Sequence, residues 1–217
     1  MPETMPKKRG RPTTPRLTRD AIGREAVAML AETGDLTLPG LAARMDVRPS
    51  AFYKHVSGRA EIIELARGAL VEKVPALDLD DPELTLEQVV RRLFRMLVAA
   101  FSAVPALTPL LFAQPVSDPT TLAVYDRAAR RLIETGMPQP LVLPFIETLD
   151  TIAAGAAIDK LAPTSAWQIP EDRHGEFATL VSVQTTADDI DPVAVIEDVL
   201  TTGILHRVAQ TTAPTSH

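Results

Sequence analysis

Apolar residues recur every three or four positions along most of this chain, and runs that alternate polar and apolar residues are scarce. A spacing of three or four places apolar side chains on one face of an α-helix, whereas a half-buried strand requires alternation. Only 4% of the residues are aromatic, and Ala and Leu are abundant. The sequence therefore predicts an all-α protein, and 217 residues are enough for one or two domains with a buried core.

Capping residues and prolines divide the chain into helices. A first helix is expected from Thr18 to Gly34, because Thr suits the N-cap and Gly suits a left-handed residue after the last turn. Residues 138–161 predict a long apolar helix, while 163–190 give no clear helical pattern. Prolines at 105, 109 and 115 are expected to break the intervening segment. The remaining helices are expected to begin near Thr37, Pro49, Gly58, Thr85, Asp118 and Asp191, the last ending near Ala209.

Charge is unevenly distributed along the chain. Residues 1–60 hold eleven Lys and Arg against six Asp and Glu, a net +5, and the remainder carries −11, which together give the overall −6. A basic head on an acidic body indicates that the head meets an anion. We expect a disordered basic arm over 1–16, a helical domain over 17–74, a larger helical domain over 75–210, and a disordered tail over 211–217.

The segment from Thr37 to His55 has the pattern of a helix, a tight turn and a second short helix. In a helix-turn-helix the second helix enters the major groove, where its early residues face base edges. Arg pairs with guanine, Ser donates or accepts, and an Ala methyl meets a thymine methyl, while Thr, Tyr and His suit phosphates. The residues expected to contact DNA are Thr37, Arg48, Pro49, Ser50, Ala51, Tyr53, Lys54, His55 and Arg59.

The N-terminal run KKRGRP, residues 7–12, is similar to an AT-hook. In that interpretation Lys7, Arg9 and Arg11 lie in or beside a narrow A·T-rich minor groove. The alternative is a disordered basic tail that attracts DNA without specificity. The sequence does not decide between them.

The runs LTRDAIGREAVAMLAETG and LTLPGLAARMDVRPSAFYKHVSGRAEIIELA resemble the TetR family of bacterial transcription regulators. The resemblance covers residues 17 to about 74 closely, with Phe52 to Val56 as its most specific part, and continues as a pattern of long helices. It implies an all-helical homodimer whose N-terminal domains bind a palindromic operator. Its bodies would dimerise and hold a small-molecule effector that releases the DNA. The resemblance implies a repressor that acts in the cytoplasm, on the nucleoid; the sequence itself does not decide between repressor and activator.

Three positions depart from the family pattern. The turn holds Asp46 where the family often has Gly, and Asp tolerates a left-handed conformation better than most residues. Arg48 replaces the usual Ser or Thr before the third helix, which removes a cap and adds a residue able to read a base. Gly40 inside the second helix is expected to cost about 1 kcal/mol relative to Ala.

An effector pocket is expected among the helix from Thr85 to Val104, the proline-broken segment and the helix over 138–161. A helix broken by proline packs less regularly and leaves room for a cavity, which is mostly apolar with a few orienting polar groups. Simple core packing is the alternative for the aromatic residues, and a solvated helix face is the alternative for Arg91, Arg92 and Arg95. The candidate pocket residues are Arg95, Met96, Leu111, Phe112, Gln114, Tyr125, Phe145, Asp150 and Trp167.

Several classes of protein are disfavoured by what the sequence lacks. Without cysteine there is no disulfide, thiolate metal site or cysteine nucleophile, and the four histidines do not have metal-ligand spacing. We expect no cofactor and no enzyme activity, since nucleophile-elbow and phosphate-loop motifs are missing. The resemblance implies a histidine in the proline-rich region where the effector is a metal chelate; PALTPLLFAQP has none, so we expect no metal-chelate effector. The N-terminus is not a secretory signal, and the apolar run near 96–107 is too short to cross a membrane. Two alternatives stay open: a DNA-binding regulator without a small ligand, and a small helical enzyme or carrier.

Overall fold

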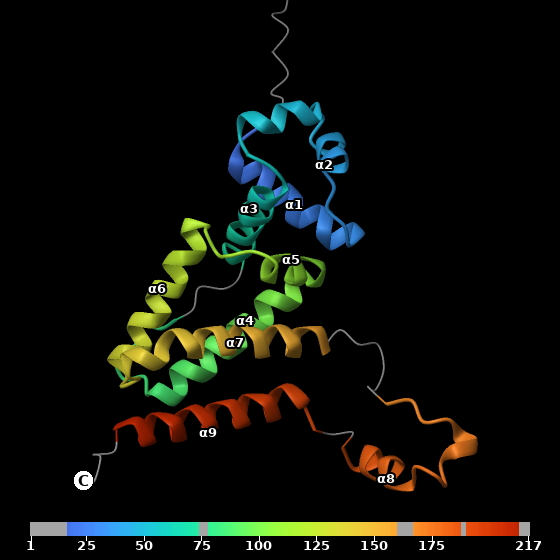
Figure 1. Ribbon diagram of the computed structural model, residues 1–217, viewed down its shortest axis with the longest axis vertical. Coiled ribbons are helices and arrows are strands. Elements are labelled where there is room, and N and C mark those ends of the chain that lie inside the picture. Colours follow the sequence, from blue (N-terminus) through green and yellow to red (C-terminus); the bar gives the residue numbers. More distant parts are fainter. Residues whose placement is uncertain (1–16, 74–77, 160–166, 188–189, 213–217) are drawn as a thin grey trace, which may run out of the picture.

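The computed structural model describes residues 17–73, 78–159, 167–187 and 190–212, and every regular element in these ranges is a helix. The predicted all-α class is confirmed. The N-terminal domain, at the top of Figure 1, consists of α1 (Arg19–Thr33), α2 (Leu38–Arg44), the 3₁₀ helix η1 (Pro49–Lys54) and α3 (Arg59–Val71). The predicted arm, with Lys7, Arg9 and Arg11, lies outside the described residues.

The body below this domain is formed by the remaining helices (Figure 1). They are α4 (Leu86–Ala103), the 3₁₀ helix η2 (Pro105–Leu107), α5 (Thr108–Phe112), α6 (Pro119–Glu134), α7 (Gln139–Asp159), the 3₁₀ helix η3 (Glu171–Arg173), α8 (Ala178–Ala187) and α9 (Pro192–Thr212). Helix α4 packs against α6, α7 and α9, so its buried face forms the centre of the body.

The N-terminal domain is organised by the crossing of α1 and α3. Gly23 permits this crossing, because a Cβ there would lie 2.4 Å from the backbone oxygen of Leu65. The predicted boundaries of α1 are confirmed: the Thr18 hydroxyl accepts a hydrogen bond from the Ala21 N–H, and Gly34 has φ 72°. The domain therefore has a fixed frame on which the second and third helices are held.

The turn between α2 and η1 forms as predicted, with Asp46 in the left-handed region at φ 52°. The predicted short third helix forms as a 3₁₀ helix, the tighter form that short segments adopt. The expected cost of Gly40 relative to Ala is corrected in one respect: a Cβ there would lie 2.6 Å from Met29 Cε, the flexible end of that side chain, and 2.8 Å from Thr37 Oγ1, so Ala would require these neighbours to shift.

The helix boundaries of the body follow their capping signals. Thr85 and Gln88 form the predicted capping box at the start of α4, and the prolines break the next segment into η2 and α5. Asp118 caps α6, which ends at Glu134 and is followed by Gly136 with φ 103°. Helix α9 extends to Thr212, past the predicted end near Ala209, so Thr211 and Thr212 are helical and do not belong to the predicted tail.

Helix α7 is the most apolar helix of the described chain. Its best 18-residue window has a mean hydropathy of 1.6 and would satisfy the length and composition of a membrane span, as would α4 with η2 and α5 taken as one segment bent by 96°. A core helix meets the same criteria, and α7 buries 44% of that window within the protein, mainly against α4. Its other face, including Leu143 and Ile158, is exposed.

The segment that carries η3 and α8 stands apart from the rest of the body in Figure 1. Neither element buries a residue. A helix that packs on no core needs no apolar stripe, which explains why the sequence over 163–190 gave no helical pattern.

Candidate nucleic-acid interface and ligand cavity

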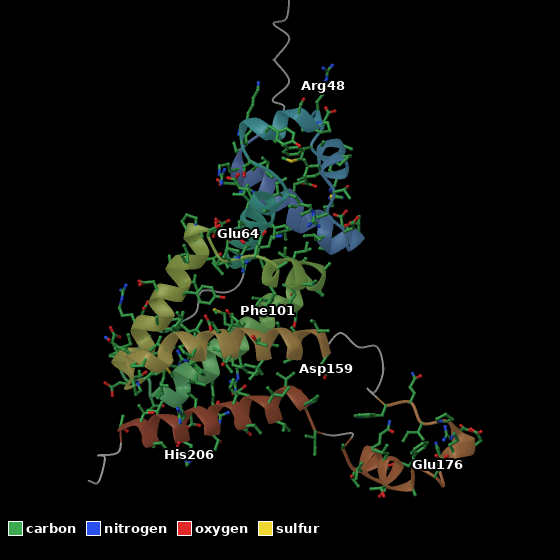
Figure 2. All side chains as sticks on the ribbon, viewed as in Figure 1. Arg48, Glu64, Phe101, Asp159, Glu176 and His206 are labelled. Carbon is green, nitrogen blue, oxygen red and sulfur yellow. The ribbon has the colours of Figure 1, made fainter. Side chains whose placement is uncertain are left out.

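Helix η1 exposes a basic and aromatic surface at the end of the molecule remote from the body. Phe52 is fully buried and anchors the helix, whereas Tyr53 is 64% exposed. Arg48 and Lys54 are also exposed, and the Arg48 side chain makes no capping hydrogen bond. Figure 2 shows Arg48 pointing away from the protein at this end. The predicted residues Pro49 and Ser50 are exposed beside them, while Ala51 and His55 are half-buried.

Two predicted residues that are distant in sequence meet at the start of α2. Arg59 Nε donates a hydrogen bond to the Leu36 carbonyl oxygen at 3.4 Å, next to Thr37, whose hydroxyl accepts from the Gly40 N–H at 3.2 Å. Exposed backbone N–H groups, a hydroxyl and a guanidinium are groups that bind phosphate oxygens. This pair therefore forms a second polar surface beside η1.

Arg19, which the sequence analysis did not single out, holds η1 in place. Its guanidinium donates to the His55 carbonyl oxygen at 2.6 Å and pairs with Glu61. The Glu61 carboxylate also accepts from the Ser57 N–H at 2.6 Å and the Ser57 hydroxyl at 2.9 Å. The Ser57 hydrogen bonds and Arg19 lower the pKa of Glu61 to about 2. This network joins α1, the end of η1 and the start of α3.

A cavity of about 380 Å³ opens inside the body between α3, α4, α6 and α7. Its walls are largely apolar, as is usual for small-molecule sites. The lining residues are Val71, Glu72, Leu79, Leu93, Met96, Leu97, Ala100, Thr120, Thr121, Val124, Tyr125, Arg127, Ala128, Ile146 and Leu149. Of the predicted pocket residues, Met96 and Tyr125 line it.

The other predicted pocket residues do not line this cavity. Tertiary partners decided their positions: Leu111 is buried beside the domain junction, and Phe112 is half exposed with its ring 5.7 Å from that of Phe101. Phe145 borders a groove between α7 and α9. Trp167 lies on the segment that carries α8 and is 63% exposed. Arg95, Gln114 and Asp150 each belong to a polar network.

Asp150 borders the cavity indirectly, through Tyr125. The Tyr125 hydroxyl donates to Asp150 Oδ2 at 2.7 Å. Burial raises the pKa of Asp150 to about 6, and burial together with the adjacent carboxylate raises the pKa of Tyr125. Sequence spacing did place Asp150 near the pocket, but only the fold shows that Tyr125 lies between Asp150 and the cavity.

Gln114 belongs to the junction between the two domains, where Glu64 and Arg67 of α3 are buried. Arg67 donates to Glu64 Oε1 at 2.9 Å and to the Leu111 carbonyl oxygen at 2.8 Å. Gln114 Nε2 donates to the same carboxylate at 3.0 Å, and the Ser117 N–H donates at 2.7 Å. Burial raises the pKa of Glu64, but these hydrogen bonds more than offset it, so the pKa lies below its ordinary value. Figure 2 places Glu64 where α3 meets the body.

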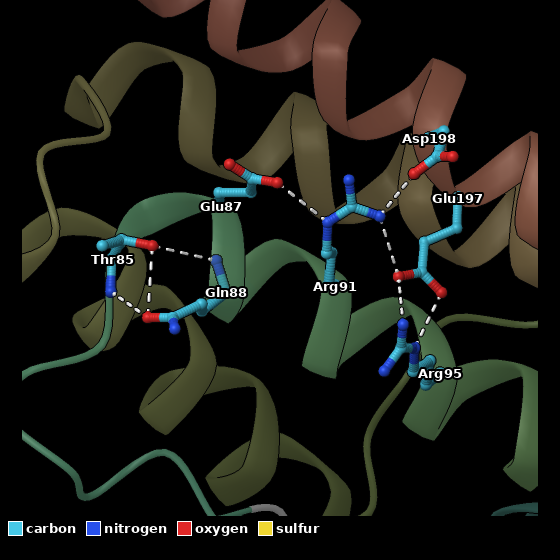
Figure 3. Close-up of polar contacts among 7 residues, drawn as sticks. All are labelled: Thr85, Glu87, Gln88, Arg91, Arg95, Glu197 and Asp198. Atoms are coloured by element: carbon cyan, nitrogen blue, oxygen red, sulfur yellow. Dashed lines mark hydrogen bonds and ion pairs between the residues drawn. The ribbon is translucent and has the colours of Figure 1, made fainter.

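Arg95 belongs to an ion-pair network between α4 and α9 (Figure 3). Its guanidinium donates to both oxygens of Glu197 at 2.8 Å, and Arg91 donates to Glu197 at 3.1 Å and to Asp198 at 2.6 Å. Glu197 is buried although it is charged. Arg91 and Arg95 therefore do more than form a solvated face of α4, because their ion pairs hold α9 on the body.

The outer faces of α7 and α9 form a second apolar surface. Between them lies a groove bordered by Leu141, Pro144, Phe145, Thr148, Ile152, Val199, Leu200, Gly203, Ile204 and Arg207. Leu143 and Val199 are 64% and 68% exposed on the same two helices. Within the described ranges, no cluster of His, Asp and Glu could hold a metal ion.

The sequence matches no protein-family model and no curated protein. Solved structures share its fold. ActR from Streptomyces coelicolor without ligand has a TM-score of 0.75 at 19% identity, over 90% of this chain and 98% of that one. The regulator SCO7222, a TetR from the same organism, has a TM-score of 0.67 at 23% identity, over 91% and 100%.

A TetR variant from Acinetobacter baumannii AYE in complex with minocycline gives a TM-score of 0.73 at 17% identity, over 93% of this chain and 100% of that one. ActR also has a structure in complex with actinorhodin, with a TM-score of 0.72 at 18% identity, over 93% and 100%. The described helices thus form a helix-turn-helix domain joined to a helical body. This is the fold of the TetR-family transcription regulators, as the sequence resemblance predicted.

Proposed function

We propose that this protein is a DNA-binding transcription repressor that binds a palindromic operator as a homodimer and releases it when a small molecule occupies the body. The observation that carries the proposal is the exposed surface of η1, where Arg48, Tyr53 and Lys54 surround a helix anchored by the buried Phe52. Basic side chains on a helix of this kind fit the major groove. Such a protein acts in the cytoplasm on the nucleoid, without cofactor, membrane or enzymatic activity.

The proposed DNA contacts are of two kinds: contacts that read bases and contacts that bind the phosphate backbone. Arg48 reads a guanine, with Pro49, Ser50 and Ala51 beside it. Thr37 and Arg59 hold a phosphate at the start of α2, where Arg59 bonds the carbonyl oxygen of Leu36, the residue before Thr37. Tyr53, Lys54 and His55 contact the backbone nearby. Lys7, Arg9 and Arg11 of the arm add minor-groove or phosphate contacts.

Dimerisation is proposed to use the apolar outer faces of α7 and α9. These faces carry several large apolar side chains that are exposed in the single chain, and a second copy would cover them in a four-helix arrangement. A two-fold dimer would present its two η1 helices to successive major grooves about 34–36 Å apart. Sedimentation that shows a monomer at micromolar concentration, both free and on DNA, would contradict this part.

The cavity between α3, α4, α6 and α7 supports a regulator that responds to a ligand over one that does not. Its volume of about 380 Å³ lies in the range of sites for small molecules. ActR and the TetR variant have been determined with actinorhodin and minocycline. An effector releases DNA only if it favours a form with wrongly spaced recognition helices, so it must bind more weakly when operator is present.

The test is selection of bound duplexes from a random pool, followed by two variants on the selected operator. Arg48→Ala should relax the base preference at one position of each half-site, at a cost of about 1–3 kcal/mol per half-site. Arg59→Ala should weaken binding to all sequences similarly and reduce the salt slope by roughly one per half-site.

The matched control is Arg130→Ala, which removes an exposed arginine of the body paired with Asp126 and should leave both properties unchanged. Failure to enrich any sequence would contradict operator recognition. Uniform weakening by Arg48→Ala with the preference intact would contradict its role as the base-reading residue.

A further inference from the structure

The hydroxyl donors that line the cavity mostly have protein partners. Arg127, the one guanidinium among the lining residues, pairs with Asp80 through Nη2 at 2.7 Å, which offsets its charge but leaves its other N–H groups unpaired within the described residues. The Thr121 hydroxyl donates to Asp118 at 2.9 Å, and the Tyr125 hydroxyl donates to Asp150 at 2.7 Å. The hydroxyl of Thr120, which is exposed on α6, makes no hydrogen bond to another described residue. An anionic ligand would therefore have to compete with Asp80 for the charge of Arg127.

The acceptors of the cavity are, in contrast, free or electron-rich. Glu72 lines it at the C-terminal end of α3, where the helix dipole adds negative potential, and no ion pair joins Glu72 to another described residue. Because the Tyr125 hydroxyl donates its hydrogen bond to Asp150, its oxygen can accept one from a ligand. Asp150 Oδ1 is buried and has no hydrogen-bond partner within the described residues, and the nearby charge of Arg67 offsets part of the negative potential behind Tyr125.

We infer that the cavity takes an apolar molecule carrying one protonated amine, in preference to a neutral or acidic molecule of the same shape. The amine donates to the Tyr125 oxygen and lies in the field of Glu72 and Asp150, while the apolar part fills the space lined by α4, α6 and α7. The inference names the class of effector for the proposed regulatory function and rests on it. Among the polar groups of this largely apolar cavity the acceptors Glu72, which is exposed at its edge, and Tyr125 favour a ligand that brings the donor and the positive charge.

The experiment compares three anthracene probes of nearly equal size on the full chain without DNA. They are 9-(aminomethyl)anthracene, anthracene-9-methanol and anthracene-9-carboxylic acid, titrated at pH 7.5 by their fluorescence. The amine should bind most tightly and the acid least, with at least roughly a tenfold difference, the effect of one pKa unit of charge interaction. Equal or tighter binding of the acid overturns the inference, as does failure of all three probes to bind at millimolar concentration.

Four variants locate the charge preference. Glu72→Gln and Asp150→Asn should each weaken the amine several-fold and leave the alcohol unchanged. Asp80→Asn removes the ion-pair partner of Arg127 and should strengthen binding of the acid. This effect is opposite in direction to that of the other two variants, which weaken binding of the amine. Asp172→Asn changes the net charge equally on the distant η3 and should have no effect; circular dichroism checks that each variant is folded. An amine preference that persists in both Glu72→Gln and Asp150→Asn overturns the inference.

The cavity itself is tested by Ala100→Leu, which places a larger side chain on its α4 wall and should weaken all three probes. Unchanged binding of all three would place the probes elsewhere and overturn the inference. The outcomes separate it from the proposed function. A charge preference that follows the variants, on a protein that selects no operator, supports the ligand class and contradicts the regulatory function. Operator binding together with tighter binding of the acid would support the regulatory function and contradict the ligand class.

Discussion

The carboxylate of Glu64 on α3 accepts a hydrogen bond from the backbone N–H of Ser117 at 2.7 Å, just before the start of α6. The same carboxylate holds Arg67, which is buried with it. Gly68 lies against this contact as well, since a Cβ there would be 2.6 Å from the Asp118 carboxylate. Helix α3, which ends the N-terminal domain, and helix α6, which lines one wall of the cavity, are thus joined through the buried carboxylate of Glu64.

Glu64→Ala should destabilise the protein by about 3–5 kcal/mol, because it leaves the Arg67 guanidinium buried without its partner. The measurement is the free energy of unfolding in urea. Glu87→Ala is the matched control: Glu87 pairs with Arg91 on an exposed helix face at 3.0 Å, and its loss should cost at most about 0.5 kcal/mol. Equal losses for the two variants would contradict the structural role of the junction.

Acid should weaken the frame that holds η1. The pKa of Glu61 is lowered to about 2, so its stabilising contribution is present above the ordinary carboxyl pKa and is lost as the pH falls from about 4.5 towards 2. The difference in unfolding free energy between the native protein and Glu61→Gln should therefore shrink over this window. A difference that stays constant between pH 6 and pH 2 would show that the carboxylate charge contributes nothing.

Glu197→Gln should loosen the attachment of α9 to α4. It removes the charge that accepts hydrogen bonds from Arg91 and Arg95 at a buried position, and the expected loss is about 1–3 kcal/mol, as for hydrogen bonds to a charged group. Because α9 carries part of the proposed dimer surface, dimer dissociation measured by sedimentation should shift to higher protein concentration. Asp198→Asn, at an exposed carboxylate, serves as control and should change either quantity little.

Deletion of residues 1–12 should weaken binding to the selected operator more when its flanks are A·T-rich than when they are G·C-rich. A narrow A·T minor groove concentrates negative potential and attracts inserted arginines, here Arg9 and Arg11. Fluorescence anisotropy on the two flanked duplexes at one salt concentration measures the difference. Equal losses would reduce the segment to a non-specific basic tether.

Local signals in the sequence predicted the helix boundaries well. Thr18, Thr85 and Asp118 cap the helices that they were expected to cap, because an N-cap satisfies backbone groups within a few residues. Asp46 adopts the left-handed turn that was expected of it. The 3₁₀ form of η1 and the added length of α9 were missed, since the end of a helix depends on what it packs against.

The predicted pocket shows the limit of this reasoning. Met96 and Tyr125 line the cavity, but Arg95 turns outward to Glu197, 102 residues away in sequence, and Gln114 turns to the domain junction. Helical spacing fixes which face a residue occupies and says nothing about which partner that face meets. Glu72 and Arg127 were missed for the same reason, because each reaches the cavity from a helix end or face whose neighbours are distant in the chain.

The sequence by itself determined the all-α class, the helix-turn-helix segment and most helix starts, because these depend on hydrophobic period and on hydrogen bonds between residues a few positions apart. Only the tertiary structure decided the position of the cavity, the meeting of Arg59 with the start of α2, and the burial of Glu64 and Glu197. These depend on contacts between residues far apart in the chain, whose side chains acquire their partners, their burial and their pKa values only when the helices pack.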